Sequence, residues 1–238
     1  MNESVDSINR LSADVRMLGR LLGIVIKEQH GDAAFDLVER VRSAAKNRRS
    51  GDQEAALDLT STIDSLDLPL LKVLIKAFSN YFQLINIAED RQRIRVLRER
   101  ERAGSLAETI DDAVGRMRAA GLDVSQVRQL LDKLCLRLVT TAHPSEAKRK
   151  EVLVKLRHIA QMLAAYDRPD LLPRERDLFE TSMIEEIEEL WHTRPTRAAK
   201  ATVSDEVEFS IYFVVSAIMD LAVEVYGEMR TALQKHYP

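Results

Sequence analysis

The sequence has little cysteine and no long hydrophobic run. Cys135 is the single cysteine in 238 residues, so an intramolecular disulfide framework is excluded, as is usual for proteins of a reducing cytosol. No stretch approaches ~18 uninterrupted apolar residues, the length that crosses a bilayer, and residues 1–20 lack the basic-then-apolar layout of a signal peptide. We therefore expect a cytoplasmic protein without a membrane partner. Because Cys135 lies in an apolar run, we expect its side chain to be buried.

Strong charge of one sign is also missing. The formal net charge is −3, which gives no general attraction to nucleic acid. The five histidines have no zinc-type spacing to cysteine or carboxylate partners. Nucleic-acid binding and zinc chemistry are therefore not expected.

What is present is helical periodicity, which predicts a mainly α fold of packed helices with one short strand. With 45% hydrophobic and 31% charged residues, the chain can bury a sizeable core in one large or two small domains. Residues 71–88 are apolar nearly all round and should be buried. The expected helices span residues 5–29, 33–46, 53–65, 68–102, 105–120, 124–134 and 152–163, then a segment reaching Trp191, and a last helix capped by Thr202 and Asp205.

One helical face carries four arginines at positions 91, 95, 98 and 102. Such a face could bind a phosphate-rich partner. Acidic residues are interleaved with it, however, at positions 89, 90, 99 and 101. This pattern favours a solvated, ion-paired face.

The most informative segment is residues 138–146, in which an apolar run ends at His143 and Pro144 follows. Residues 134–141 alternate in polarity and predict a strand. Pro144 suits the first turn of a helix, which would place His143 at a helix N-terminus, where a neutral imidazole beside an anion is favoured. Local pattern alone leaves two interpretations open, a capping or core histidine and a proton-accepting one.

The segment Thr141-Ala142-His143-Pro144-Ser145-Glu146, followed by Arg149, closely resembles the Thr-Ala-His-Pro-Thr-Glu signature of phosphoenolpyruvate carboxylases. Three further blocks resemble this family in the same order. They are Leu18 to Arg42 with its Leu-Gly-Arg-Leu-Leu-Gly run, Lys76 to Glu89, and Glu185 to Thr193 followed by Asp205-Glu206. Together the four blocks extend over nearly the whole chain, so residues 1–238 resemble an N-terminal portion of the family.

The resemblance implies an enzyme that joins bicarbonate to phosphoenolpyruvate with Mg²⁺ or Mn²⁺, giving oxaloacetate and phosphate. By resemblance, His143 is the catalytic residue that assists the breakdown of carboxyphosphate, and the complete enzyme is a homotetramer. The strand would be the first of the family's parallel α/β barrel. The implied regions are an N-terminal helical region over 1–133, the strand, His143 corner and helix over 134–166, and further helices over 167–238.

The sequence also departs from the family. After Arg197 the usual Arg-Pro pair is replaced by Lys200-Ala201, so Arg194, Arg197 and Lys200 are only weak candidates for contacting an anionic substrate. The family's glycine-rich loop, later arginines and metal-binding carboxylates would lie beyond Pro238. We therefore expect the 238-residue chain to be inactive by itself. The alternatives are a non-catalytic helical interaction scaffold derived from the carboxylase N-terminus and a histidine phosphocarrier.

Overall fold

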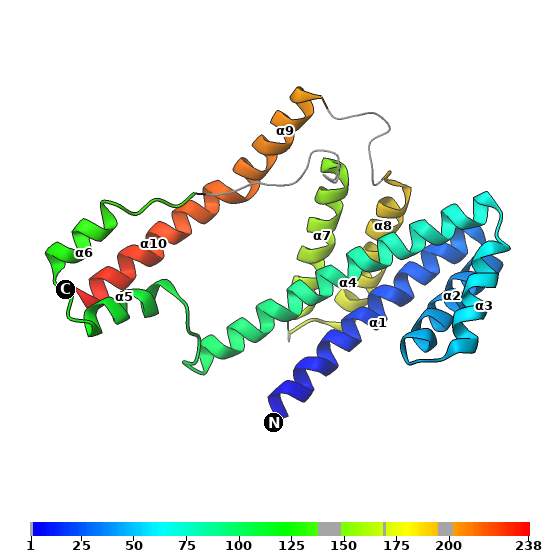
Figure 1. Cartoon of the computed structure of the whole chain (residues 1–238), viewed down its shortest axis with the longest axis horizontal. Helices are drawn as coiled ribbons and strands as arrows, with labels where there is room; N and C mark the ends of the chain where they lie inside the picture. Colours follow the sequence, from blue (N-terminus) through cyan, green and yellow to red (C-terminus); the bar gives the residue numbers. More distant parts are fainter. Residues whose placement is uncertain (1, 138–148, 169, 195–201) are drawn as a thin grey trace. The chain divides into compact units, whose positions relative to one another are not determined.

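A computed structural model of the chain describes residues 2–137, 149–168, 170–194 and 202–238, and over these ranges the fold is mainly α, as predicted (Figure 1). The chain forms two compact units. Unit 1 comprises Met1–Val96 and Glu151–Pro195, and unit 2 comprises Leu97–Lys150 and Thr196–Pro238. Unit 1 contains the helices α1 (Asn2–His30), α2 (Asp32–Arg49) and α3 (Gln53–Asp64), most of α4 (Leu68–Arg102), α7 (Lys150–Tyr166) and α8 (Pro173–His192). Unit 2 contains the end of α4, α5 (Ile110–Ala119), α6 (Val124–Leu131), α9 (Val203–Phe213), the π-helix η1 (Val214–Ile218) and α10 (Met219–His236).

The core of unit 1 is built from one apolar face of each of its long helices. In α1 the buried residues recur at Leu18, Leu21, Leu22, Val25 and Ile26, the three-and-four spacing of an amphipathic helix. They join one apolar cluster with the buried faces of α4, α7 and α8. The α4, α7 and α8 members of that cluster include Leu84, Ile159, Leu163, Met183 and Ile187, each with an exposed fraction of 0%.

Unit 2 is held by the packing of α5 against α10. Gly115 lies against His236, and a Cβ added at this glycine would be 3.1 Å from the imidazole ring. Next to this contact, Asp111 accepts a hydrogen bond from Lys235 at 2.7 Å and pairs with Nε2 of His236 at 3.0 Å. Hydrogen bonds from Lys235 hold the pKa of Asp111 below its ordinary value, against a smaller opposing effect of desolvation. The start of α5 is thereby joined to the end of α10.

Several helix boundaries agree with the sequence-based expectations. Helix α4 spans Leu68–Arg102, the predicted range. Thr202 caps α9 by accepting a hydrogen bond from the Asp205 backbone N–H, and the Asp205 side chain accepts one from the Thr202 N–H, a capping box. Helix α5 begins five residues later than predicted, because Thr109 is its N-cap.

The predicted strand is not found in the part of residues 134–141 that the structure describes. Residues 134–137 are irregular, and 138–141 lie outside the described ranges. The prediction that Cys135 is buried was wrong, since its side chain is exposed, as are Leu134 and Leu136. The physical reason is that a strand needs a partner for its backbone hydrogen bonds and a cover for its apolar face, and no partner strand is present among the described residues.

The expectation that residues 71–88 are buried on all sides was also wrong. Leu74, Ala77 and Leu84 are buried, whereas Ile75 and Phe82 are 59% and 57% exposed. Neighbouring helices of unit 1 therefore cover one side of this part of α4. Because this part of α4 is apolar on nearly every side, the sequence did not indicate which side faces the core.

The helical stretch Val203–His236 is long and apolar enough, by length and composition alone, to cross a membrane. None of its most apolar window is buried within the structure. Its continuous helix includes the π-turn η1, whose i→i+5 hydrogen bonding differs from that of the flanking α-helices.

Candidate functional site

The structure describes one of the four residues that the sequence proposes for the site. Arg194 follows α8 and has an exposed side chain. His143, Arg197 and Lys200 lie outside the described residues, and their roles stay predictions. What the structure does define is the scaffold to which these segments are attached, α7 after the histidine motif and α8 before the basic segment.

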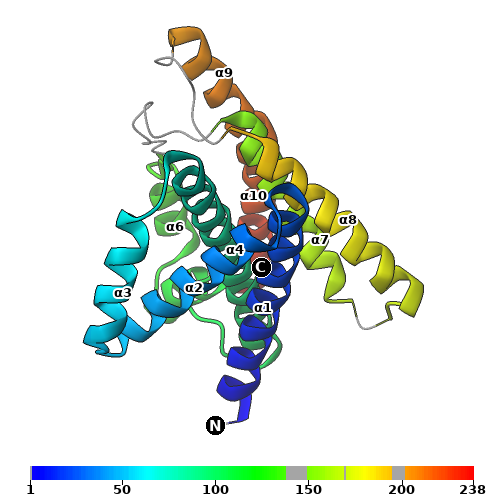
Figure 2. The same cartoon turned by 90° about the vertical axis from the view of Figure 1, so that its right-hand side faces the viewer.

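Helices α7 and α8 form an antiparallel hairpin, and they lie side by side in both views of the fold (Figures 1 and 2). At one end, Tyr166 stacks on Phe179 with ring centroids 4.2 Å apart. Toward the other end, Lys155 forms ion pairs with Glu186 and Glu189. The chain therefore enters α7 and leaves α8 at the same end of the hairpin.

The end of α8 is fixed in the core by Trp191, which is 1% exposed. The ammonium of Lys76 lies over the indole, 4.6 Å from the ring centroid, and the imidazole of His30 packs edge-on at 5.5 Å. One turn earlier, Gln29 donates a hydrogen bond to Glu188 at 2.6 Å. Helices α1, α4 and α8 are thus joined immediately before Arg194.

Two titratable groups in this cluster have shifted pKa values. Burial lowers the pKa of His30, and the neighbouring Lys76 and His192 lower it further. Burial also lowers the pKa of Lys76. Both shifts favour the neutral forms of these side chains. An uncharged imidazole is compatible with the packing of His30 against the indole.

The sequence did not reveal this cluster. His30 was expected at a helix end, and α1 does end at His30, but its contact with Trp191 joins residues far apart in the chain. His192 and His158 were expected to be packing or surface residues. His192 is exposed, and His158 Nδ1 pairs with Glu186 at 2.6 Å on the exposed side of the hairpin. Only the aromatic side chain of Trp191 was a signal for this packing.

The arginine face of α4 is ion-paired, though not in the predicted way. Arg91 and Arg95 both bind Asp167, each with a shortest nitrogen–oxygen distance of 2.5 Å, and Arg95 also binds Asp14 at 2.6 Å. Arg95 is 8% exposed, so this part of the face is buried and not solvated. These ion pairs join α1, α4 and Asp167, which directly follows α7, so the two arginines stabilise the packing of unit 1.

No group of three or more histidine, cysteine, aspartate or glutamate side chains suited to a metal ion occurs within the described residues. The residues available in those ranges therefore do not fit a resident divalent cation. They define a mainly helical protein whose α7–α8 hairpin is anchored in the core of unit 1.

Comparison with known proteins gives the family. The sequence matches the family model described as Phosphoenolpyruvate carboxylase over residues 11–238. It is 40% identical over 233 residues to a phosphoenolpyruvate carboxylase of Roseiflexus castenholzii, covering 96% of this chain and 25% of that protein. It is 37% identical to one from Burkholderia vietnamiensis, covering 97% of this chain and 24% of that protein. The chain belongs to the phosphoenolpyruvate carboxylase family and spans about a quarter of the length of the curated relatives it matches.

Proposed function

We propose that this chain supplies the N-terminal, histidine-bearing part of an enzyme that carboxylates phosphoenolpyruvate with bicarbonate, yielding oxaloacetate and inorganic phosphate. The observation that supports this most strongly is the family match, which extends through the His143 motif. The hairpin adds a structural argument, because the segment carrying His143 enters it at the end where the segment beginning with Arg194 leaves. The scaffold alternative is not favoured, since scaffolding requires no imidazole in this motif.

In the proposed reaction, a bicarbonate oxygen attacks phosphorus and the phosphorus–oxygen bond to the enol breaks, giving carboxyphosphate and the enolate of pyruvate. His143 accepts the proton from the carboxyl group of carboxyphosphate, so that phosphate leaves and CO₂ is released. The enolate carbon then forms a bond to CO₂, giving oxaloacetate. An imidazole is suited to this proton transfer because its unperturbed pKa, about 6.5, lies near neutral pH.

The remaining parts of the proposal concern groups that the described residues do not provide. Mg²⁺ or Mn²⁺ would neutralise phosphoryl charge, and we assign its ligands to other parts of a complete enzyme. We propose phosphoenolpyruvate and bicarbonate as ligands of that enzyme, a homotetrameric assembly, a cytoplasmic location, and no nucleic-acid or membrane partner. Without the metal ligands and further cations, the 238-residue chain is inactive alone, because phosphoryl chemistry needs preorganised positive charge.

A chimeric enzyme tests the proposal directly. Residues 11–238 replace the matching N-terminal quarter of the Roseiflexus castenholzii relative, and oxaloacetate is measured by its NADH-dependent reduction in a coupled assay. We expect Mg²⁺-dependent and bicarbonate-dependent oxaloacetate formation by the chimera and none by the 238-residue chain. A soluble, folded chimera that forms no oxaloacetate would contradict the proposal.

The role of His143 is tested within an active chimera. His143→Asn should lower kcat by about 10²-fold or more, the usual contribution of a general acid–base group. His158→Asn is the matched control, because His158 lies on α7, is half exposed and pairs only with Glu186 among the described contacts. Unchanged kcat in His143→Asn would instead support the scaffold interpretation.

A further inference from the structure

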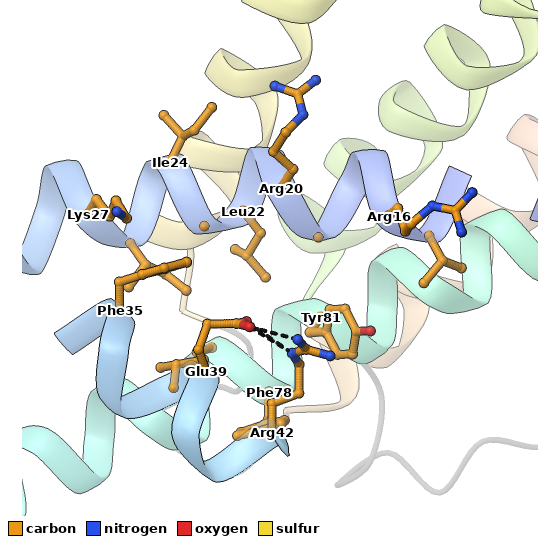
Figure 3. Close-up of a pocket in the computed structure, with 16 residues that line it drawn as sticks. Arg16, Arg20, Leu22, Ile24, Lys27, Phe35, Glu39, Arg42, Phe78 and Tyr81 are labelled. Carbon is orange, nitrogen blue, oxygen red and sulfur yellow. Dashed lines mark hydrogen bonds and ion pairs between the residues drawn. The ribbon is translucent and has the colours of Figure 1, made fainter. Parts of the chain in front are cut away.

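A pocket of about 520 Å³ opens in unit 1 between α1, α2 and α4 (Figure 3). This volume is within the range of sites that hold small organic molecules. None of its lining residues belongs to the hairpin end or to the predicted carboxylation residues. The pocket is therefore a feature that the proposed function does not use.

Aromatic rings line the pocket opposite a part of α1 where two glycines lack side chains. Gly19 and Gly23, one turn apart on α1, present no side chains. A Cβ at Gly23 would be 2.8 Å from the ring of Phe35, and one at Gly19 would be 3.4 Å from Tyr81. Phe78 lines the same pocket. The two glycines thus let these rings pack closely against α1, and Phe35, Phe78 and Tyr81 form an aromatic part of the pocket wall.

The polar lining of the pocket is mainly cationic. It contains Arg16, Arg20, Lys27 and Arg42, against the single carboxylate of Glu39. Arg20 points away from α2 in Figure 3 and pairs with Glu180 at 2.8 Å. Lys27 lies over the ring of Phe35 and pairs with Asp32 at 3.1 Å.

Two arginines remain for a ligand. Arg42 binds Glu39 through Nε, at 3.0 and 3.2 Å, and through Nη2, at 2.7 Å, which leaves Nη1 without a hydrogen bond to the described residues. Figure 3 shows this guanidinium between Glu39 and Tyr81. Arg16 lines the pocket and has no hydrogen bond or ion pair with any residue in the described ranges.

Positive charge continues beyond Arg42. A second hollow of about 740 Å³ shares Arg42, Phe78 and Tyr81 with the pocket, and its other charged lining residues are Lys46, Arg48 and Arg49. No acidic residue lines it. This concentration of cations in a chain with a net charge of −3 creates a local field that attracts anions.

We propose that the pocket binds a small organic anion with a flat apolar body, a ligand class separate from the carboxylation substrates. The apolar body lies in the pocket against the rings of Phe35, Phe78 and Tyr81. The carboxylate or phosphate group binds Nη1 of Arg42 and the guanidinium of Arg16. Arginine suits both anions, because its planar donors match their oxygens.

Calorimetric titration of the 238-residue chain tests the ligand class. The probes are 2-naphthoate, 2-naphthyl phosphate, the uncharged 2-naphthamide and inorganic phosphate. We expect one site per chain, with the two naphthyl anions bound at least tenfold more tightly than 2-naphthamide or phosphate, and their relative affinities identify the preferred anion. Equal affinity for 2-naphthoate and 2-naphthamide would overturn the proposal.

Matched variants locate the binding. Arg42→Gln and Arg16→Gln should each weaken 2-naphthoate binding about tenfold, and Glu39→Gln should strengthen it by removing the one carboxylate of the lining. Arg40→Gln is the control, because Arg40 is exposed on the same helix and lines none of these hollows. An equal loss of affinity in Arg40→Gln and Arg42→Gln would refute the assignment.

A filling variant separates this pocket from other apolar surfaces. Gly19→Leu should abolish binding, while replacing a helical glycine with a good helix former supports folding. Circular dichroism and the fluorescence of Trp191, the single tryptophan, report whether the variant folds. If folded Gly19→Leu binds 2-naphthoate as tightly as the unmodified chain, the proposed pocket is wrong.

Discussion

Arg95 shows how one side chain can hold several segments of unit 1 together. Its guanidinium binds Asp14 on α1 and Asp167 after α7, and Asp167 is also bound by Arg91. Burial alone would raise the pKa of Asp167, but hydrogen bonds from the two arginines outweigh it and hold the pKa below its ordinary value. The ion pairs therefore remain formed throughout the neutral pH range.

Removing Arg95 should destabilise unit 1 strongly. Arg95→Gln removes the ion pair with the buried carboxylate of Asp14 and leaves Asp167 with Arg91 alone of the two arginines. Breaking a buried ion pair by removing one partner costs about 3 kcal/mol. Urea unfolding followed by Trp191 fluorescence measures the loss, because this indole is buried in the core of the same unit. Arg93→Gln, which alters an exposed arginine of the same helix, should change the unfolding free energy by less than about 0.5 kcal/mol. Similar losses in both variants would contradict a special role for Arg95.

Sequence reasoning identified the arginine face but not its partners. Periodicity places Arg91 and Arg95 on one side of a helix, and nearby carboxylates suggested local pairing. The actual partners lie 72 to 81 positions away for Arg95. Such pairs depend on how helices pack, which the spacing within one helix does not encode. The contact of His30 with Trp191 was missed for the same reason.

At the scale of elements, the helices were predicted well, whereas residues 134–137, the described part of the predicted strand, are irregular. Local signals decide a helix, including caps such as Thr202 and breaks such as Gly51, whose φ is +95°. A strand is stabilised only by another strand, so residues 134–137 could not be assigned from their alternation alone. Likewise, composition could not show that Phe82 faces outward while Leu84 is buried.

The α7–α8 hairpin is the element that we propose positions the reactive segments, so its packing should determine its stability. Ile187 is completely buried in the unit 1 core, and Ile187→Ala should cost about 3 kcal/mol through lost burial and a residual cavity. Leu178→Ala on the same helix is the control, since Leu178 is 65% exposed. Urea midpoints from Trp191 fluorescence compare the two variants. Equal midpoints for Ile187→Ala and the unmodified chain would show that α8 is not anchored as described.

At the scale of the whole molecule, charge and apolar surface are distributed unevenly. Unit 1 carries the cationic hollows lined by α2. In unit 2, apolar residues recur at every fourth position along α9, η1 and α10, at Ile211, Val215, Met219 and Val223, with exposed fractions of 55%, 61%, 59% and 73%. A continuous stripe of exposed apolar side chains is uncommon on soluble monomers and marks an interaction surface or an aggregation site.

We expect the 238-residue chain to self-associate through this stripe. Sedimentation velocity should give a weight-average coefficient that rises with protein concentration, and the double variant Val215→Lys, Val223→Lys should reduce that rise because it places charge in the apolar contact. Leu57→Lys is the matched control, since Leu57 on α3 is 74% exposed but lies in unit 1. A coefficient independent of concentration would contradict self-association. Co-flotation of the chain with phosphatidylcholine vesicles, lost in the double variant, would show instead that the stripe binds lipid, contrary to the sequence-based expectation of no membrane partner.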